Sequence, residues 1–310
     1  MNKPFRFGVQ AKTAASRREW IELAKKTEDL GYDTLTVPDH FDGQLAPTLA
    51  LQAAADATST LRVGALVWCN DYRHPVVFAN EMATLDLLSE GRLELGIGAG
   101  WMKSDYDAAG MTYDRPGVRI DRMIESVQIL KGLFADGALS FEGEHYTITD
   151  LDLQPKPLQK PHPPFLMGGG GPRFLGLAGQ HANIVGVNPN LKAGLIDSNT
   201  ASDATAERYA EKISWVRDGA ADRFDEIELN VRVFVVMFTD DRKGTSEALA
   251  PGMGMQPSDA LESPLALVGD VESMKEDLIA RREIYGFSYI GIGPDEIDQF
   301  APIVADLAGR

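Results

Sequence analysis

The feature that most constrains this chain is a regular alternation of short apolar strand segments with amphipathic helical segments along its length. This pattern, without a linker or a shift in composition, is typical of a parallel sheet covered by helices. The sequence predicts strands at Phe5–Gln10, Thr34–Val37, Leu61–Trp68, Leu93–Ile97, Pro164–Met167, Asn183–Val187, Glu228–Phe238 and Ser288–Ile292. It predicts intervening helices, of which the clearest are Ser16–Leu30, Pro75–Leu88, Gly117–Phe134 and Val271–Tyr285.

Eight strand segments within 310 residues favour one α/β domain over residues 1–310, a single (β/α)8 TIM barrel. An open, doubly wound sheet stays an alternative, because it is built from the same strand and helix units. Two segments interrupt the alternation. Residues 138–163, which are rich in proline, predict a hairpin and extended insertion after the fourth helix, and residues 239–263 predict a lid loop after the seventh strand.

The charge and cysteine content exclude several classes of function. A formal net charge of −16 argues against a nucleic-acid partner, whose phosphates would be repelled. Cys69 is the only cysteine, so the chain has no intrachain disulfide and no multi-cysteine metal site, and we expect no metal. The N-terminal residues resemble no signal peptide, and no run of about 18 apolar residues occurs. The sequence therefore predicts a cytoplasmic protein without a membrane partner.

Two strand ends are unusually rich in glycine. Residues 92–101 read Arg-Leu-Glu-Leu-Gly-Ile-Gly-Ala-Gly-Trp, with glycine at every second position from 96 to 100, and residues 165–171 read Phe-Leu-Met-Gly-Gly-Gly-Gly. Glycine lets a ligand approach the main chain where a Cβ would stand in its way. Free N–H groups at the start of the following helix also favour an anion. One cofactor held across the mouth of the barrel is therefore expected.

Asp39 and His40 stand side by side at the end of the second predicted strand, where catalytic groups of a barrel lie. A histidine there can exchange a proton near neutral pH, and a neighbouring carboxylate can orient it. A structural alternative is that Asp39 caps a short helix and His40 only hydrogen-bonds a loop.

The chain resembles the bacterial luciferase-like superfamily of flavin and deazaflavin enzymes. The resemblance rests on Tyr72-Arg-His-Pro, on Glu81 to Trp101, on Pro-Pro-Phe-Leu-Met-Gly-Gly-Gly-Gly at 163–171 and on Leu-Val-Gly-Asp at 267–270. Within the superfamily, the chain is most similar to oxidoreductases that use coenzyme F420. The resemblance implies a barrel with insertions, a homodimer, and hydride transfer between coenzyme F420 and a small organic substrate.

The resemblance also implies roles for individual residues. His40 is expected to be catalytic as a proton donor or acceptor, with Asp39 beside it against the reactive edge of the deazaflavin ring. Leu66 and Val67 match a place where the family has a non-prolyl cis peptide behind the ring. Further cofactor contacts are expected from the strand ends and the turn that they precede, namely from Gly98, Ala99, Gly100, Gly168, Gly169, Gly170 and Gly171. Arg173 could add positive charge there, although a solvated arginine is an equal alternative.

The substrate side departs from the family's sugar-phosphate dehydrogenases. In these enzymes an acidic residue, a proposed proton donor, follows the glycines of the fourth strand, whereas this chain has Trp101. The resemblance therefore argues against glucose 6-phosphate as substrate. Trp68, Trp101 and Tyr113 predict an apolar or aromatic substrate pocket, with core packing as the alternative. Two other functions stay open, an FMN-dependent monooxygenase that uses molecular oxygen and a non-catalytic protein that binds a flavin or deazaflavin.

Overall fold

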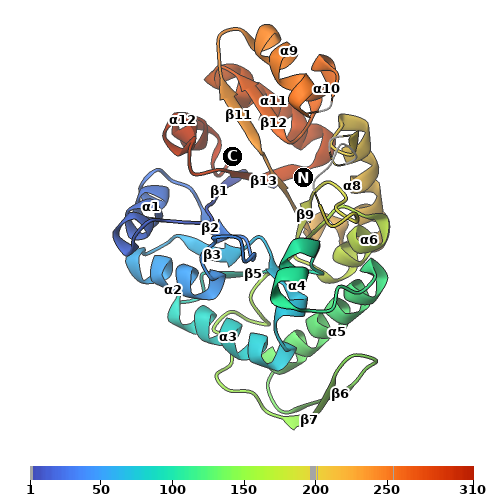
Figure 1. Cartoon of the computed structure of the whole chain (residues 1–310). Coiled ribbons are helices and arrows are strands. Elements are labelled where there is room, and N and C mark those ends of the chain that lie inside the picture. The colour runs from blue at the N-terminus through green and yellow to red at the C-terminus, as the bar shows by residue number, and fades with distance from the viewer. Residues whose placement is uncertain (1–2, 196–199, 201, 254) are drawn as a thin grey trace.

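The computed structural model describes residues 3–195, 200, 202–253 and 255–310, and its parallel strands form a closed barrel (Figure 1). The strands run in the order β3-β2-β1-β13-β10-β9-β8-β5, and a parallel pairing of β3 with β5 closes the ring. This closure confirms the (β/α)8 barrel and excludes the open sheet. The barrel strands are β1 (Arg6–Gln10), β2 (Thr34–Val37), β3 (Arg62–Ala65), β5 (Leu93–Gly98), β8 (Phe165–Gly169), β9 (Ile184–Val187), β10 (Glu228–Arg232) and β13 (Phe287–Ile292).

Helices surround the barrel and bury their apolar faces against the strands (Figure 1). Those that alternate with barrel strands begin and end near the predicted positions. They are α1 (Arg17–Asp29), α2 (Pro47–Ala57), α3 (Pro75–Leu88), α5 (Pro116–Phe134), α6 (Pro172–His181), α8 (Ala206–Ala220), α11 (Val271–Tyr285) and α12 (Ile297–Leu307). Among the residues that the structure describes, no helix is long and apolar enough to cross a membrane.

The third predicted strand is interrupted. Its first part is β3, and after Leu66 and Val67 the chain continues as the short strand β4 (Trp68–Cys69), which pairs with the end of β5. The peptide bond between Leu66 and Val67 is cis, as the resemblance implied. Continuous apolar character concealed this break, because both parts of the segment are buried.

The seventh predicted strand also divides into two strands. After β10 the chain leaves the barrel and forms β11 (Val235–Phe238), which pairs in parallel with β12 (Ala266–Gly269) outside it. The segment predicted as a lid loop, 239–263, instead contains α9 (Arg242–Met253) and α10 (Pro257–Glu262), and its residue 254 lies outside the described residues. Thus this segment and the second sheet form a small addition to the barrel, at the top of the view in Figure 1.

The segment 138–163 contains an antiparallel hairpin of β6 (Leu139–Glu142) and β7 (Thr147–Leu151), which projects away from the barrel (Figure 1). Beyond the hairpin the chain runs without regular structure to β8, through two cis prolyl bonds at Pro155 and Pro161. This arrangement agrees with the hairpin and extended segment that the prolines predicted. A short helix, α4 (Lys103–Ala109), follows β5 and was not predicted.

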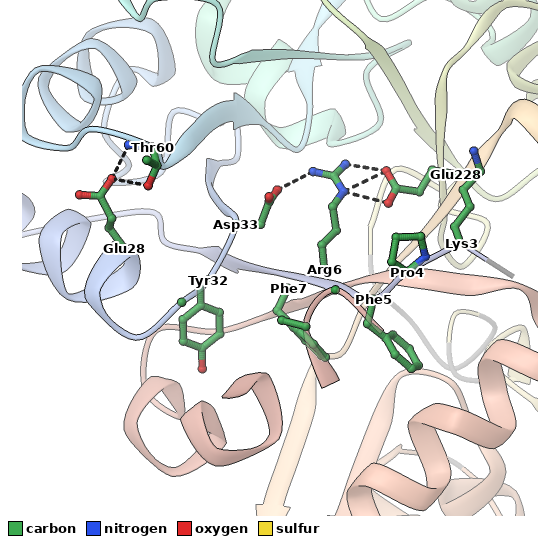
Figure 2. Close-up of a pocket in the computed structure, with 13 residues that line it drawn as sticks. Lys3, Pro4, Phe5, Arg6, Phe7, Glu28, Tyr32, Asp33, Thr60 and Glu228 are labelled. Atoms are coloured by element: carbon green, nitrogen blue, oxygen red, sulfur yellow. Dashed lines mark hydrogen bonds and ion pairs between the residues drawn. The ribbon is translucent and has the colours of Figure 1, made fainter. Parts of the chain in front are cut away.

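An ionic cluster joins the N-terminal ends of the barrel strands. Arg6 at the start of β1 forms ion pairs with Asp33 (2.7 Å), Glu94 (2.5 Å) and Glu228 (2.6 Å) from three other segments. Figure 2 shows the guanidinium between Asp33 and Glu228. Its carbon also lies 3.9 Å from the centroid of the buried Tyr289 ring. These interactions tie the strands together at the end of the barrel opposite the strand C-termini.

Candidate active site

A cavity of about 730 Å³ opens among the C-terminal ends of the barrel strands. This volume lies within the range of small-molecule and cofactor sites. Its lining includes most of the predicted site residues, namely Asp39, His40, Leu66, Val67, Gly98, Ala99, Gly100, Trp101, Gly168, Gly169, Gly170, Gly171 and Arg173. The structure therefore brings the loops after β2, β3, β5 and β8 to one cavity.

His40 is held by a carboxylate that the sequence analysis did not single out. Its Nδ1 lies 2.6 Å from Oδ2 of Asp105 on α4, and the hydroxyl of Tyr72 donates to the same oxygen at 3.0 Å. Since an ionised carboxylate can only accept, the imidazole hydrogen lies on Nδ1. The other ring nitrogen, Nε2, is left as the one that can take up a proton. Burial raises the pKa of Tyr72, which therefore stays a hydrogen-bond donor.

Asp39 was expected to orient the neighbouring His40, but its carboxylate has other partners. Its carboxylate accepts hydrogen bonds from Arg73 at 2.5 and 3.3 Å and from the backbone N–H of Cys69 at 2.9 Å. These bonds hold the end of β2 against β4 and neutralise the buried carboxylate. Asp39 neither caps a helix nor contacts the imidazole through a hydrogen bond, and the partner of His40 is Asp105.

The glycines in and after β5 let neighbouring segments of the protein pack closely and also leave space in the cavity. A Cβ on Gly96 would lie 1.8 Å from the carbonyl oxygen of Ala65, and one on Gly98 would lie 2.5 Å from a methyl of Val67. Gly100 has a φ of +76° and stands over the Tyr106 hydroxyl. Bare backbone on β5 therefore lets the segment around Val67 pack closely, and the side chain of Val67 forms part of the cavity wall.

The turn between β8 and α6 exposes main chain at a helix start. Gly171 is the N-cap of α6 and has no capping side chain, so the first N–H groups of the helix are available to an anion. Arg173 in the first turn lines the cavity and also pairs with the exposed Asp121. Arg173 is thus about half exposed, as a solvated arginine would be, and it also lies beside the turn, where it could add positive charge.

The predicted aromatic pocket is corrected in two of its three members. Trp68 is fully buried and packs against Phe78 of α3 with ring centroids 5.6 Å apart, because its position on β4 faces the helices. Tyr113 lies behind the wall and donates a hydrogen bond to the carbonyl oxygen of Trp101 at 2.8 Å. Trp101 does line the cavity and packs edge-on against His40, with centroids 5.5 Å apart.

Cys69 also reaches the cavity wall, but it is not poised as a nucleophile. Burial raises the pKa of its thiol to about 12, and the sulfur lies 3.5 Å from the Tyr106 hydroxyl. A thiol that stays protonated is a weak nucleophile and a poor metal ligand. Within the described part of the chain, no three histidine, cysteine or acidic side chains gather as they would around a metal ion.

Sequence reasoning missed the side of the cavity formed by β1, β9 and β10. Gln10 and Arg232 lie at the ends of two of these strands, and Lys192 lies in the loop after the third. Lys192 and Arg232 were not among the predicted site residues, yet the structure brings both to one cavity. The signal that could have identified them in the sequence is their place at, or in the loop after, the C-terminal end of a strand. Apolar residues on the same side of the cavity are Leu191, Phe234, Val235, Met255 and Leu265.

Comparisons with curated proteins find relatives of two kinds. A protein of Amycolatopsis mediterranei (strain U-32) named F420-dependent glucose-6-phosphate dehydrogenase is 31% identical over 161 residues, 49% of this chain and 48% of the relative. One of the same name from Segniliparus rotundus is 26% identical over 99% of this chain and 90% of the relative. The FMNH(2)-dependent dimethylsulfone monooxygenase of Pseudomonas putida is 30% identical over 56% of this chain and 48% of the relative. The first and third alignments span about half of those relatives.

Solved structures share the fold along the whole chain. An F420-dependent secondary alcohol dehydrogenase in complex with an F420-acetone adduct matches with a TM-score of 0.79 at 20% identity, covering 98% of this chain and 99% of that one. The coenzyme F420 dependent tetrahydromethanopterin reductase of Methanopyrus kandleri matches with a TM-score of 0.78, also at 20% identity, with coverage of 98% and 99%. The family model for luciferase-like monooxygenases matches residues 1–251. The chain therefore belongs to the luciferase-like monooxygenase family, as the resemblance in its sequence indicated.

Proposed function

We propose that this chain is an oxidoreductase that transfers a hydride between coenzyme F420 and a small organic substrate. The observation that carries the proposal is His40, which lies in the cavity wall with Nδ1 fixed by Asp105 and Nε2 available for proton transfer. F420 dehydrogenases among its relatives support the choice of cofactor.

The cavity fits a large, flat cofactor with an anionic tail. Leu66 and Val67 supply an apolar wall for a ring system. The adjoining wall, formed by Gly98 to Gly100, has few side-chain atoms that would obstruct a ligand. The start of α6 after Gly171 supplies N–H groups for a phosphate. When bound there, F420 supplies the ring carbon that accepts or donates the hydride. The chain's own contribution is to hold the ring, to exclude water with Trp101 and to move a proton at His40.

Glucose 6-phosphate is not the substrate that we propose, although relatives carry that name. The position expected to hold an acidic proton donor is Trp101, whose indole packs against His40. An indole N–H cannot act as an acid at neutral pH. Asp105 does not replace that acid, because its carboxylate is occupied by His40 and Tyr72.

A titration of purified protein with F420 and, separately, with FMN tests the proposal. We expect F420 to bind at least ~10-fold more tightly, a difference of about 1.4 kcal/mol, measured by fluorescence quenching and thermal stabilisation. A preference for FMN would instead make the protein an FMN-dependent monooxygenase, the alternative that the Pseudomonas relative favours. Binding of either cofactor without turnover of any substrate would favour a non-catalytic binder.

His40→Ala tests the mechanism separately from cofactor choice. We expect the variant to bind the cofactor as the wild type does and to lose ~10²–10⁴-fold in turnover, the usual contribution of a general acid or base. Undiminished turnover would refute the role of His40. The homodimer and the cytoplasmic location stay predictions, which size-exclusion chromatography with light scattering and cell fractionation would test.

A further inference from the structure

Arg232 is a largely buried cation whose charge the described residues leave without an ion pair. At the end of β10, its Nε donates to Oε1 of Gln10 at 3.2 Å and its Nη1 donates to the carbonyl oxygen of Val233. No hydrogen bond from Nη2 to a described residue is present. Burial lowers the pKa of this guanidinium to about 10, and the carboxylate of Glu296 partly opposes that shift. Arg232 therefore stays charged at neutral pH, and its Nη2 donates no hydrogen bond to a described residue.

Other acidic groups near the cavity are already occupied. Asp39, the only carboxylate among the described residues of the wall, pairs with Arg73, and Asp105 behind the wall holds His40. Burying a cation without a partner is costly, and such a group binds an anion strongly when one is supplied. Hence the wall presents an unused positive charge to whatever enters the cavity.

Apolar side chains line the cavity beside Arg232. Phe234, two residues further on, is 60% exposed at the cavity wall, and its ring centroid lies 5.2 Å from the guanidinium carbon of Arg232. Val235, Met255 and Leu265 line the same side. An exposed aromatic ring beside a fork of N–H donors suits a ligand with a flat apolar body and a small anionic head.

This apolar side lies across the barrel mouth from the proposed ring wall, since β10 is four strands away from β3 in the barrel order. Gln10 connects the two sides, because its Nε2 donates to the carbonyl oxygen of Leu66 at 2.9 Å while its Oε1 accepts from Arg232. A molecule held by Arg232 is therefore next to the segment against which the cofactor ring is proposed to lie.

We propose that Arg232 recognises the substrate and that the substrate is an organic acid with a flat apolar body, whose carboxylate pairs with the guanidinium. The inference rests on the proposed function, since it takes the glycine-rich side of the cavity as the cofactor site. It adds a substrate class and a residue that determines specificity.

Benzoate and benzamide are matched probes, because they have the same shape and differ in charge. We expect the wild type, with and without F420, to bind benzoate at least ~10-fold more tightly than benzamide by calorimetry. Arg232→Gln should bind the two probes equally and keep its affinity for F420. Arg173→Gln, which removes another cation of the same wall, should keep the preference, because a general positive potential would otherwise explain it.

A second measurement uses the wild type alone, so its result does not depend on whether a variant folds. Phenylglyoxal modifies accessible guanidinium groups, and mass spectrometry of the wild type reports the rate at Arg232. Benzoate should slow that modification at least ~10-fold under saturating conditions, whereas benzamide should not.

Three results would overturn the inference. They are that benzoate binds no better than benzamide, that the preference survives in Arg232→Gln, or that benzoate does not protect Arg232 from phenylglyoxal. Loss of F420 affinity in Arg232→Gln with benzoate preference intact would assign the guanidinium to the cofactor instead. A protein that binds FMN in place of F420 would refute the proposed function alone, because the benzoate measurements on the cofactor-free protein stand without it.

Discussion

Gly98→Ala tests whether the bare backbone of β5 serves the packing of Val67. The added Cβ would lie 2.5 Å from Cγ2 of Val67 on a fully buried strand, whereas carbon atoms pack at about 3.5–4.0 Å. The neighbouring side chain must therefore move by about 1 Å or more. Because the strand holds Gly98 in place, Val67 is the group that moves.

Overpacking of this kind costs about 1–3 kcal/mol of unfolding free energy. For a chain of this size we expect the melting temperature to fall by about 2–12 °C, at roughly 2–4 °C for each kcal/mol. Val67 lines the cavity, so its displacement should also weaken cofactor binding by ~10-fold. Differential scanning fluorimetry measures the fall in melting temperature, and titration with the cofactor that the wild type binds measures the loss of affinity.

Two further variants calibrate the result. Gly176→Ala in α6 places its Cβ 3.8 Å from the nearest atom, so it should stabilise the helix by about 0.5–1 kcal/mol and leave cofactor binding unchanged. Gly96→Ala meets a backbone oxygen at 1.8 Å and should yield little folded protein. If Gly98→Ala matches the wild type in both melting temperature and cofactor affinity, the placement of Val67 against β5 is wrong.

The remaining predictions concern three carboxylate interactions. Asp105→Asn should lower turnover ~10- to 100-fold and abolish the downfield NMR signal of the His40 Nδ1 proton, because a charged hydrogen bond is lost; persistence of that signal would contradict the assignment. Arg6→Met should destabilise the protein by about 3–5 kcal/mol in urea unfolding, since it leaves three carboxylates together. Arg18→Met, at an exposed pair, is the control and should change stability by less than about 0.5 kcal/mol. The pKa of Glu28 is lowered, because the hydrogen bonds that it accepts outweigh its burial. Its stabilisation is therefore full above the usual glutamate pKa and is lost at lower pH, so the difference in melting temperature between the wild type and Glu28→Gln should shrink as the solution is acidified.

The sequence by itself determined the alternation of strands and helices and the ends of the helices, whereas the pairing of β3 with β5 in the tertiary structure decided for a closed barrel over an open sheet. Local signals sufficed for these elements: apolar periodicity set the strands and helices, and proline at the start of α3 and Gly31 just after α1 marked helix boundaries. Asp39 and His40 were found from their place after a strand, because parallel strands in a barrel present their C-terminal ends to one site.

Only the tertiary structure decided which side chains meet. Asp105 reaches His40 from 65 positions away in the sequence, and Arg232 meets Gln10 across 222 positions, distances over which no periodic pattern carries information. Trp68 has an apolar side chain in a buried strand, and its direction toward α3 depended on the break after Ala65. A local pattern indicates a helix because its hydrogen bonds are local, and a strand because its buried faces recur at short spacing, whereas the partners of a buried charge depend on how distant elements pack.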